Sequence, residues 1–260
     1  ESLAEAAREL RRRGIVTTTL GIGADFQEEL LGVMSRVGGG QFYYVQRAEQ
    51  LDAMLQAEIG EAMAVIAHGV TLQLCPSPGV RLRLMSDYPS AWTGTHLAVE
   101  VGDLISGQQL ELLVGVRLPS ALTGETASVE VCVTDADGPI ELPIQTVSWQ
   151  LAPGRANDRQ PRDPAVTRLA AEVIAAQALL ATLRFNRRGD FGAVRHQLDE
   201  AIAKVRRLGD SDLEVDRHVR ALLEARERLT QYVDEHELKA RYFAGTSAAR
   251  SKRPDGTARR

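Results

Sequence analysis

Residues 17–25 have the composition of a turn that could bind an anion. They read Thr-Thr-Thr-Leu-Gly-Ile-Gly-Ala-Asp. A glycine-rich turn from a strand into a helix exposes backbone N–H groups, which can hold a phosphate or a carboxylate. The segment lacks the third glycine of the dinucleotide pattern and the Lys-Ser/Thr pair of the P-loop pattern. We therefore favour a tight structural turn at Gly21 and Gly23 over a nucleotide site.

Residues 134–138, Thr-Asp-Ala-Asp-Gly, place two carboxylates two positions apart before a glycine, as calcium-binding loops do. The further acids and the late glutamate of such a loop are missing. Asp and Gly also tolerate the left-handed backbone of a tight turn. We favour a hairpin turn between two strands over a calcium site.

Histidine and cysteine show no catalytic or metal-binding spacing. The five histidines form no HxxxH or HExxH pattern: His68, His96, His196, His218 and His236. Cys75 and Cys132 have no histidine nearby in sequence, so they cannot complete a four-ligand zinc site. Buried thiols are our first interpretation of this pair and a mutual disulfide is the second. No serine lies in a G-x-S-x-G turn, so we predict no catalytic residue, no cofactor-binding residue and no metal ligand in the chain, and no enzyme activity.

The composition is that of an ordinary soluble globular protein. Of 260 residues, 44% are hydrophobic and 25% charged, which excludes a wholly disordered or fibrous chain. The net charge is −4 although basic residues dominate the last eleven positions, so the rest of the chain is acidic. An acidic body argues against nucleic-acid binding. Apolar stretches such as residues 62–67 are far shorter than the ~20 residues of a membrane-spanning helix, so we expect no transmembrane segment.

Residues 1–66 alternate between helical and strand patterns. Helices are expected at 2–13, 26–37 and 47–66, and strands at 15–20 and 42–45. This order predicts a parallel sheet covered by helices. The last helix has an apolar stripe that we expect to be buried: Leu51, Met54, Leu55, Ile59, Ala62, Met63 and Ile66.

The remaining chain divides into a strand-rich and a helical region. Residues 67–151 alternate apolar and polar positions in six or seven short runs, which predicts an antiparallel β-sandwich. Residues 152–163 have the composition of a polar linker. Helical periodicity over 164–244 predicts a hairpin or three-helix bundle that folds as its own domain. We expect residues 245–260 to be a disordered basic tail.

The first region resembles a known family. Four strings occur in order with natural spacings: Gly14-Ile-Val-Thr-Thr-Thr-Leu-Gly-Ile-Gly23, Leu30-Leu-Gly-Val-Met-Ser-Arg-Val-Gly-Gly-Gly40, Gln41-Phe-Tyr-Tyr-Val45 and Leu51-Asp-Ala-Met-Leu-Gln-Ala-Glu58. Together they resemble the C-terminal half of a bacterial von Willebrand factor type A (VWA) domain of the calcium-activated-chloride-channel-like group. The resemblance implies an α/β fold with a Rossmann-like parallel sheet, followed by the sandwich and the helices.

The family's metal-ion-dependent adhesion site has no counterpart in these residues. It requires a D-x-S-x-S turn, which the sequence lacks. Residues 1–10 already have helical spacing, so we expect a truncated N-terminus, with this site upstream of Glu1. A divalent cation, Mg²⁺ or Ca²⁺, would then belong to the full-length protein. Gly21 and Gly23 end their strand at the edge where open α/β sheets bind ligands, which makes them a candidate ligand-edge turn.

The resemblance implies a non-enzymatic scaffold or interaction protein whose partner is another protein. The alternative is an accessory part of an enzyme or ion-handling complex whose catalytic half lies upstream. The compartment stays open, with the cytoplasm favoured over export. The oligomeric state and the pairing of Cys75 with Cys132 also stay open.

Overall fold

The computed structural model describes residues 2–119, 124–136, 138–140, 142–157, 159–209, 212–250, 252 and 259. The chain divides into two compact units. The first, which we call the helical unit, comprises Glu1–Ile59, Gln109–Leu113 and Asp163–Arg260, and the second, the strand unit, comprises Gly60–Gln108 and Val114–Arg162. Each unit is described below by itself.

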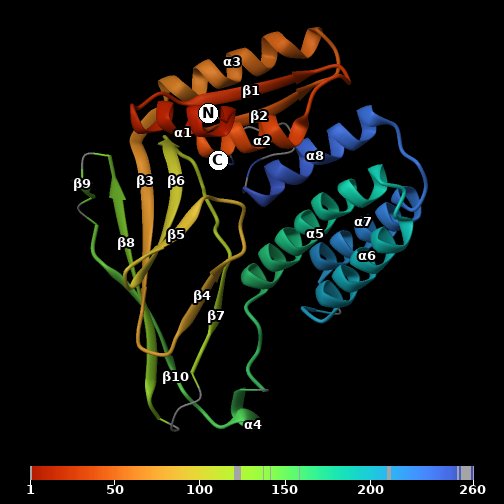
Figure 1. Cartoon of the computed structure of the whole chain (residues 1–260). Coiled ribbons are helices and arrows are strands. Elements are labelled where there is room, and N and C mark those ends of the chain that lie inside the picture. The colour runs from red at the N-terminus through yellow and green to blue at the C-terminus, as the bar shows by residue number, and fades with distance from the viewer. Residues whose placement is uncertain are drawn as a thin grey trace. The chain divides into compact units, whose positions relative to one another are not determined.

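The N-terminal part of the helical unit is a small α/β layer. Its elements are α1 (Leu3–Arg12), β1 (Thr17–Ile22), α2 (Glu28–Val37), β2 (Gly39–Val45) and α3 (Glu49–Met63), whose last residues extend beyond the unit boundary. β1 and β2 are parallel, as predicted, but they form a sheet of only two strands. Figure 1 shows α3 on one side of this pair and α2 on the other.

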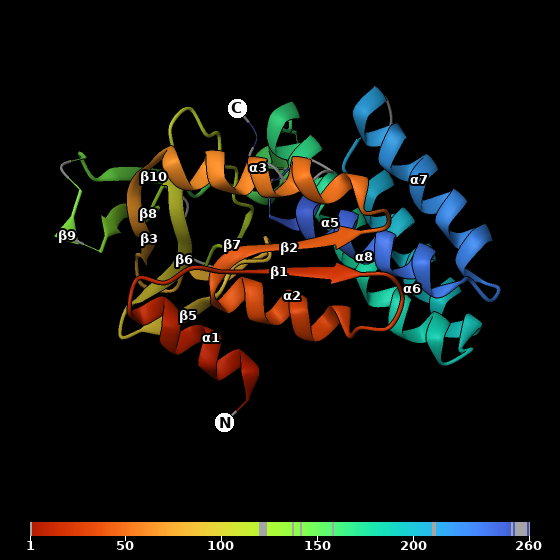
Figure 2. The same cartoon turned by 90° about the horizontal axis from the view of Figure 1, so that it is seen from above.

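Local sequence explains where these elements begin and end. Ser2 and Glu5 form a capping box at the start of α1. Gly14 follows this helix with φ of 78°, a backbone conformation that costs little only for glycine. Along β1 the burial alternates, because Thr19 and Gly21 face inward toward α2 whereas Ile22 is exposed. Figure 2 shows β1 and β2 side by side, between α3 and α2.

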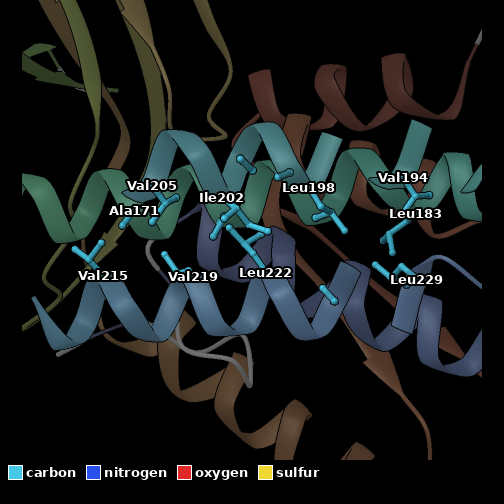
Figure 3. Packing of buried hydrophobic residues seen from close by; sticks show 14 of the residues in the cluster. Ala171, Leu183, Val194, Leu198, Ile202, Val205, Val215, Val219, Leu222 and Leu229 are labelled. Atoms are coloured by element: carbon cyan, nitrogen blue, oxygen red, sulfur yellow. The ribbon is translucent and has the colours of Figure 1, made fainter. Parts of the chain in front are cut away.

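The C-terminal part of the helical unit is a bundle. Its helices are α5 (Pro164–Arg187), α6 (Phe191–Arg206), α7 (Leu213–Leu229) and α8 (Glu235–Ala249). Each begins after an aspartate whose carboxylate accepts hydrogen bonds from first-turn amides: Asp163, Asp190, Asp212 and Asp234. The apolar residues that mark the helical period form one core, shown in Figure 3, to which α5, α6 and α7 all contribute.

Helix α8 corrects two expectations at the C-terminal end. It is a fourth helix beyond the predicted three, and its last turns include residues 245–249, which we expected to be disordered. Gly245 and Ser247 are buried there, and a Cβ at position 245 would lie 2.9 Å from the Leu180 side chain. Of the remaining tail, residues 251, 253–258 and 260 lie outside the described residues, and Arg259 pairs with Glu172 of α5.

Aromatic packing joins α8 to the α/β layer. The ring of Phe243 lies 6.1 Å from that of Phe42 and 5.9 Å from that of Tyr43, between centroids. Gln41 Nε2 donates to Ser247 Oγ at 3.4 Å, and Arg250 Nη1 donates to the carbonyl of Gly40 at 2.9 Å. The structure therefore groups residues of the predicted 1–66 and 164–244 domains in one unit, because aromatic side chains far apart in sequence share one core.

Helix α5 is long and apolar enough, by length and composition alone, to cross a membrane. The sequence led us to expect no transmembrane segment. A core helix of a bundle has the same length and composition, and Ala171 and Leu183 of α5 are buried among the other helices.

The strand unit contains one six-stranded antiparallel sheet and one separate two-stranded sheet. Its strands are β3 (Val65–Pro76), β4 (Arg81–Leu84), β5 (Ser90–Thr93), β6 (His96–Ile105), β7 (Val114–Arg117), β8 (Thr126–Asp135), β9 (Gly138–Pro139) and β10 (Gln145–Gln150). The larger sheet has the order β10-β8-β3-β6-β5 with β9 beside β8, and β4 pairs with β7. The antiparallel strands that we predicted for this region are present. The structure does not show that they form the predicted β-sandwich. A short helix, α4 (Gly154–Asn157), lies within the predicted linker.

Candidate functional site

A cleft of about 490 Å³ opens beside the carboxyl end of β1 in the helical unit. Open α/β sheets bind ligands at this edge of the sheet. The cleft is lined by residues 24–30, which lead from β1 into α2, and by Arg187, Glu235 and Lys239 from α5 and α8. Segments that are about 200 positions apart in sequence thus share one cleft.

Gly21 and Gly23 lie next to this cleft but do not line it. A Cβ at position 21 would lie 2.3 Å from the ring of Phe26, so glycine there allows the ring to pack on the strand. Gly23 has φ of 72° with no atom within 4 Å of an added Cβ, so its role is conformational. Gly21 thus lies within β1 and Gly23 just after it, and their predicted role toward a ligand stays a prediction.

The two glycines should respond differently to alanine. Gly21→Ala is expected to lower the free energy of unfolding by about 2 kcal/mol, because Phe26 must leave a packed aromatic cluster. Gly23→Ala should cost only about 1 kcal/mol, the strain of an L-residue in the left-handed region. Urea unfolding of both variants measures the difference. Equal losses would mean that displacing Phe26 costs no more than the backbone strain at position 23.

A buried ion pair, Lys239 with Glu28, lies among the residues that line the cleft. Lys239 Nζ lies 2.9 Å from Glu28 Oε2, with Lys239 2% and Glu28 3% exposed. The same ammonium group donates to the carbonyl of Phe26 at 2.7 Å and lies 4.2 Å from the centroid of its ring, where a cation is attracted by the π electrons. All of these contacts hold α8 to the start of α2.

Arg187 extends the pair into a network. Its guanidinium contacts Glu28 and donates to Glu235 Oε2 at 3.0 Å. Burial alone would raise the pKa of Glu28, but hydrogen bonds from Lys239 and Arg187 outweigh it and hold the pKa below its ordinary value. Burial alone would likewise lower the pKa of Arg187, whereas Glu235 and Glu28 raise it. The charges in the cleft therefore stabilise one another in their ionised forms.

The charged residues of the cleft form a network of ion pairs. Buried Lys239 and partly buried Arg187 are both paired with carboxylates. In the part of the chain that the structure describes, no group of three or more His, Cys, Asp or Glu side chains could hold a metal ion.

The other candidates from the sequence, residues 134–138 and the two cysteines, lie on the strands and the hairpin of the larger sheet. β8 and β9 pair with Asp135 opposite Gly138, which confirms the hairpin at 134–138, although Asp137 lies outside the described residues. Cys75 and Cys132 are free and half-buried on β3 and β8. Cys75 lies opposite Glu130 and Cys132 opposite Gln73, so the thiols are diagonal neighbours across the two strands. Burial raises the pKa of the Cys75 thiol.

Two histidines lie on the helices α7 and α8. His218 is half-buried, and burial lowers its pKa. His236 is exposed, but its Nδ1 lies 2.8 Å from the hydroxyl of Tyr44. This contact is a further link between α8 and β2.

Glu28, Arg187 and Lys239 were not among the residues predicted from the sequence. A lysine is rarely fully buried, yet Lys239 is buried. A local signal existed for this helix: Leu238, Tyr242 and Phe243 predict that one side of α8 is apolar and packed, and Lys239 adjoins that side. No local pattern identifies Glu28 as its partner.

The structure contradicts our prediction that the apolar stripe of α3 is buried. None of the residues of α3 is buried, and Ile59 is 60% and Met63 85% exposed. The reason lies in Glu58, whose carboxylate accepts hydrogen bonds from Tyr43 at 2.7 Å and Thr18 at 2.8 Å. These bonds turn Glu58 toward the sheet, so Leu55, Ile59 and Met63, the α3 stripe, face outward.

No protein-family model and no curated protein matches this sequence. Among solved structures, a von Willebrand factor type A protein from Catenulispora acidiphila matches 95% of the chain with a TM-score of 0.67 and 14% identity. The chain spans 62% of the length of that structure. The ArnB paralog VWA2 from Sulfolobus acidocaldarius matches 93% of the chain and 56% of its own length, with a TM-score of 0.48 and 18% identity. The first match shows that the chain has a VWA-type α/β fold.

Proposed function

We propose that this chain is a non-enzymatic protein-interaction protein that contacts another protein through the α3 stripe. We further propose that its α/β layer is the C-terminal part of a VWA domain of the bacterial calcium-activated-chloride-channel-like group. In this proposal the described residues bind no cofactor and act as a scaffold. A divalent cation, where the whole protein uses one, is held by other residues.

The observation that carries the proposal is the outward position of Leu55, Ile59 and Met63 on α3, a helix whose Met54 packs against the aromatic core. An amphipathic helix normally turns its apolar stripe toward the core, because burial of apolar area is favourable by about 25 cal/mol per Å². Here the acidic Glu58 faces the sheet and Ile59 and Met63 face outward. A contiguous apolar helix face of this kind is typical of a protein contact surface.

The α3 stripe should be dispensable for folding. Ile59→Glu is expected to change the free energy of unfolding by no more than about 0.5 kcal/mol, because the side chain is 60% exposed. The same substitution should abolish binding to a partner that packs on the stripe. A photo-crosslinking amino acid in place of Ile59, in cells that naturally produce the protein, tests for such a partner.

The matched control places the same crosslinker at Arg220, an exposed position on α7. We expect one protein adduct of defined mass from position 59, none from position 220, and loss of the adduct when Leu55→Glu is added. Identical adducts at both positions, or an adduct that survives Leu55→Glu, would rule out the stripe as the contact.

A further inference from the structure

Three arginines lie together on the two-stranded sheet of the strand unit. β4 and β7, side by side in Figure 1, are antiparallel, with Arg81 directly opposite Arg117 and Arg83 opposite Gly115. Because side chains alternate along a strand, all three arginines share the face turned away from Leu82, which is 8% exposed. The three arginines themselves are exposed. We call them the arginine face.

The arginine face gathers the positive charge of a long stretch of sequence. Between residues 60 and 154 its members are the only lysine or arginine residues, and the other charged residues of that stretch are all aspartates or glutamates. All three are arginine, whose planar guanidinium binds a carboxylate through two parallel hydrogen bonds. The composition of the face therefore suits recognition of a carboxylate better than nonspecific attraction does.

No carboxylate within the chain neutralises this face, as far as the described residues extend. None of the three guanidinium groups forms a hydrogen bond or an ion pair with a described residue. Arg81 and Arg117 are directly opposite each other, and like charges in that position of an antiparallel pair are destabilising. A cluster that repels itself in the free chain is stabilised when an anionic partner binds to it.

We propose that the arginine face binds an extended acidic segment of a partner protein, with carboxylates at alternate positions of that segment. Alternate side chains of an extended chain repeat every ~6.8 Å, which is also the spacing of Arg81 and Arg83 along β4. One carboxylate of the segment pairs with Arg83, and the next lies between Arg81 and Arg117. Two acidic side chains thus engage all three guanidinium groups.

Charge and spacing favour an acidic peptide over other anions. A nucleic acid draws its affinity from many cations along its backbone, whereas this chain has a net charge of −4 and only three arginines on this face. A free phosphate ion has no second anionic group for Arg83. This surface is separate from the α3 stripe, so the inference goes beyond the proposed function.

A peptide titration of the intact chain tests the proposal. The probe is a synthetic peptide of about seven residues that alternates aspartate with serine. We expect saturable shifts of the backbone amide resonances of Arg81–Leu84 and Val114–Arg117, with a dissociation constant on the order of 100 μM to 1 mM at low salt. Binding should weaken as salt is added, because exposed ion pairs are screened. A peptide with the same aspartates in one consecutive run should bind more weakly.

Arg81→Gln removes the guanidinium that adjoins both of the others. The dissociation constant of the alternating peptide should rise about fivefold or more. Arg81→Lys restores the charge without the planar guanidinium, so it should recover only part of the affinity. The matched control is Arg220→Gln, which removes an exposed arginine of α7 and should leave the affinity unchanged.

A stability measurement separates binding from a structural role. Arg117→Gln should weaken peptide binding and yet leave the thermal midpoint of the free chain unchanged or raised, because it relieves the repulsion with Arg81. An arginine that served only to hold β7 in place would lower the midpoint when replaced.

Three results would overturn the proposal. The peptide could cause no saturable shift in β4 and β7, or Arg81→Gln and Arg220→Gln could weaken its binding equally. Inorganic phosphate or a short single-stranded DNA could bind the arginine face as tightly as the peptide, which would assign the face to a different anion. The α3 substitution Ile59→Glu lies outside this face, so failure here and failure of the proposed function are separate observations.

Discussion

Lys239→Met should lower the free energy of unfolding by about 3 kcal/mol, because it leaves the carboxylate of Glu28 buried with one fewer cation. Glu28 is 3% exposed, and Lys239 Nζ lies 2.9 Å from its Oε2. Arg187 still contacts Glu28 and offsets part of the loss. Urea unfolding at neutral pH measures the effect.

The double substitution Glu28→Gln with Lys239→Met is the control. It removes both charges, and replacing a whole buried pair is often neutral. We expect the double variant to recover at least half of the stability that Lys239→Met loses. A double variant as unstable as the sum of its two single variants would show that the two groups do not interact.

The same pair gives stability a defined pH dependence. The folded pKa of Glu28 lies below its ordinary value of 4.5, so the ionised carboxylate stabilises the fold above that pH. The contribution is lost as the pH falls through the lowered folded pKa. The stability difference between the natural chain and Glu28→Gln should therefore be full at neutral pH and disappear in acid. A difference that grows toward low pH would contradict this assignment.

Asn186→Ala should cost about 2 to 3 kcal/mol, because it leaves two backbone carbonyls at the end of α7 without a donor. The side chain is 1% exposed, and its Nδ2 donates to the carbonyl of Leu229 at 2.6 Å and to that of Gln231 at 2.8 Å. One amide thus ends α7 and fixes it to α5. Thermal and urea unfolding should both show the loss.

Thr230→Ala is the matched control for Asn186. Its hydroxyl also donates to carbonyls near the end of α7, to Arg226 at 2.8 Å, but it is only partly buried. Water can replace it there, so a loss of less than about 1 kcal/mol is expected. If the two substitutions lower the free energy of unfolding equally, burial does not increase the contribution of the Asn186 hydrogen bonds to stability.

The sequence by itself determined most elements and the VWA-type fold. Periodicity placed α1 and α2 close to their observed bounds and predicted helices over 164–244, because an amphipathic helix repeats its apolar residues locally. The hairpin between β8 and β9 followed from Asp and Gly alone, since the turn needs only residues that tolerate its backbone. Gly23 was located correctly in the turn directly after β1 for the same reason, whereas Gly21 is still part of the strand.

Only the tertiary structure decided which surfaces these elements bury. The apolar period of α3 predicted a buried stripe, but two hydrogen bonds from Tyr43 and Thr18 to Glu58 turn the stripe outward. Lys239 had the pattern of a solvated charge, yet it pairs with Glu28, 211 positions away. Periodicity reports which face of a helix is apolar. Which face meets the core depends on partners that are distant in sequence, because contact energies between such segments exceed the local preference of either one.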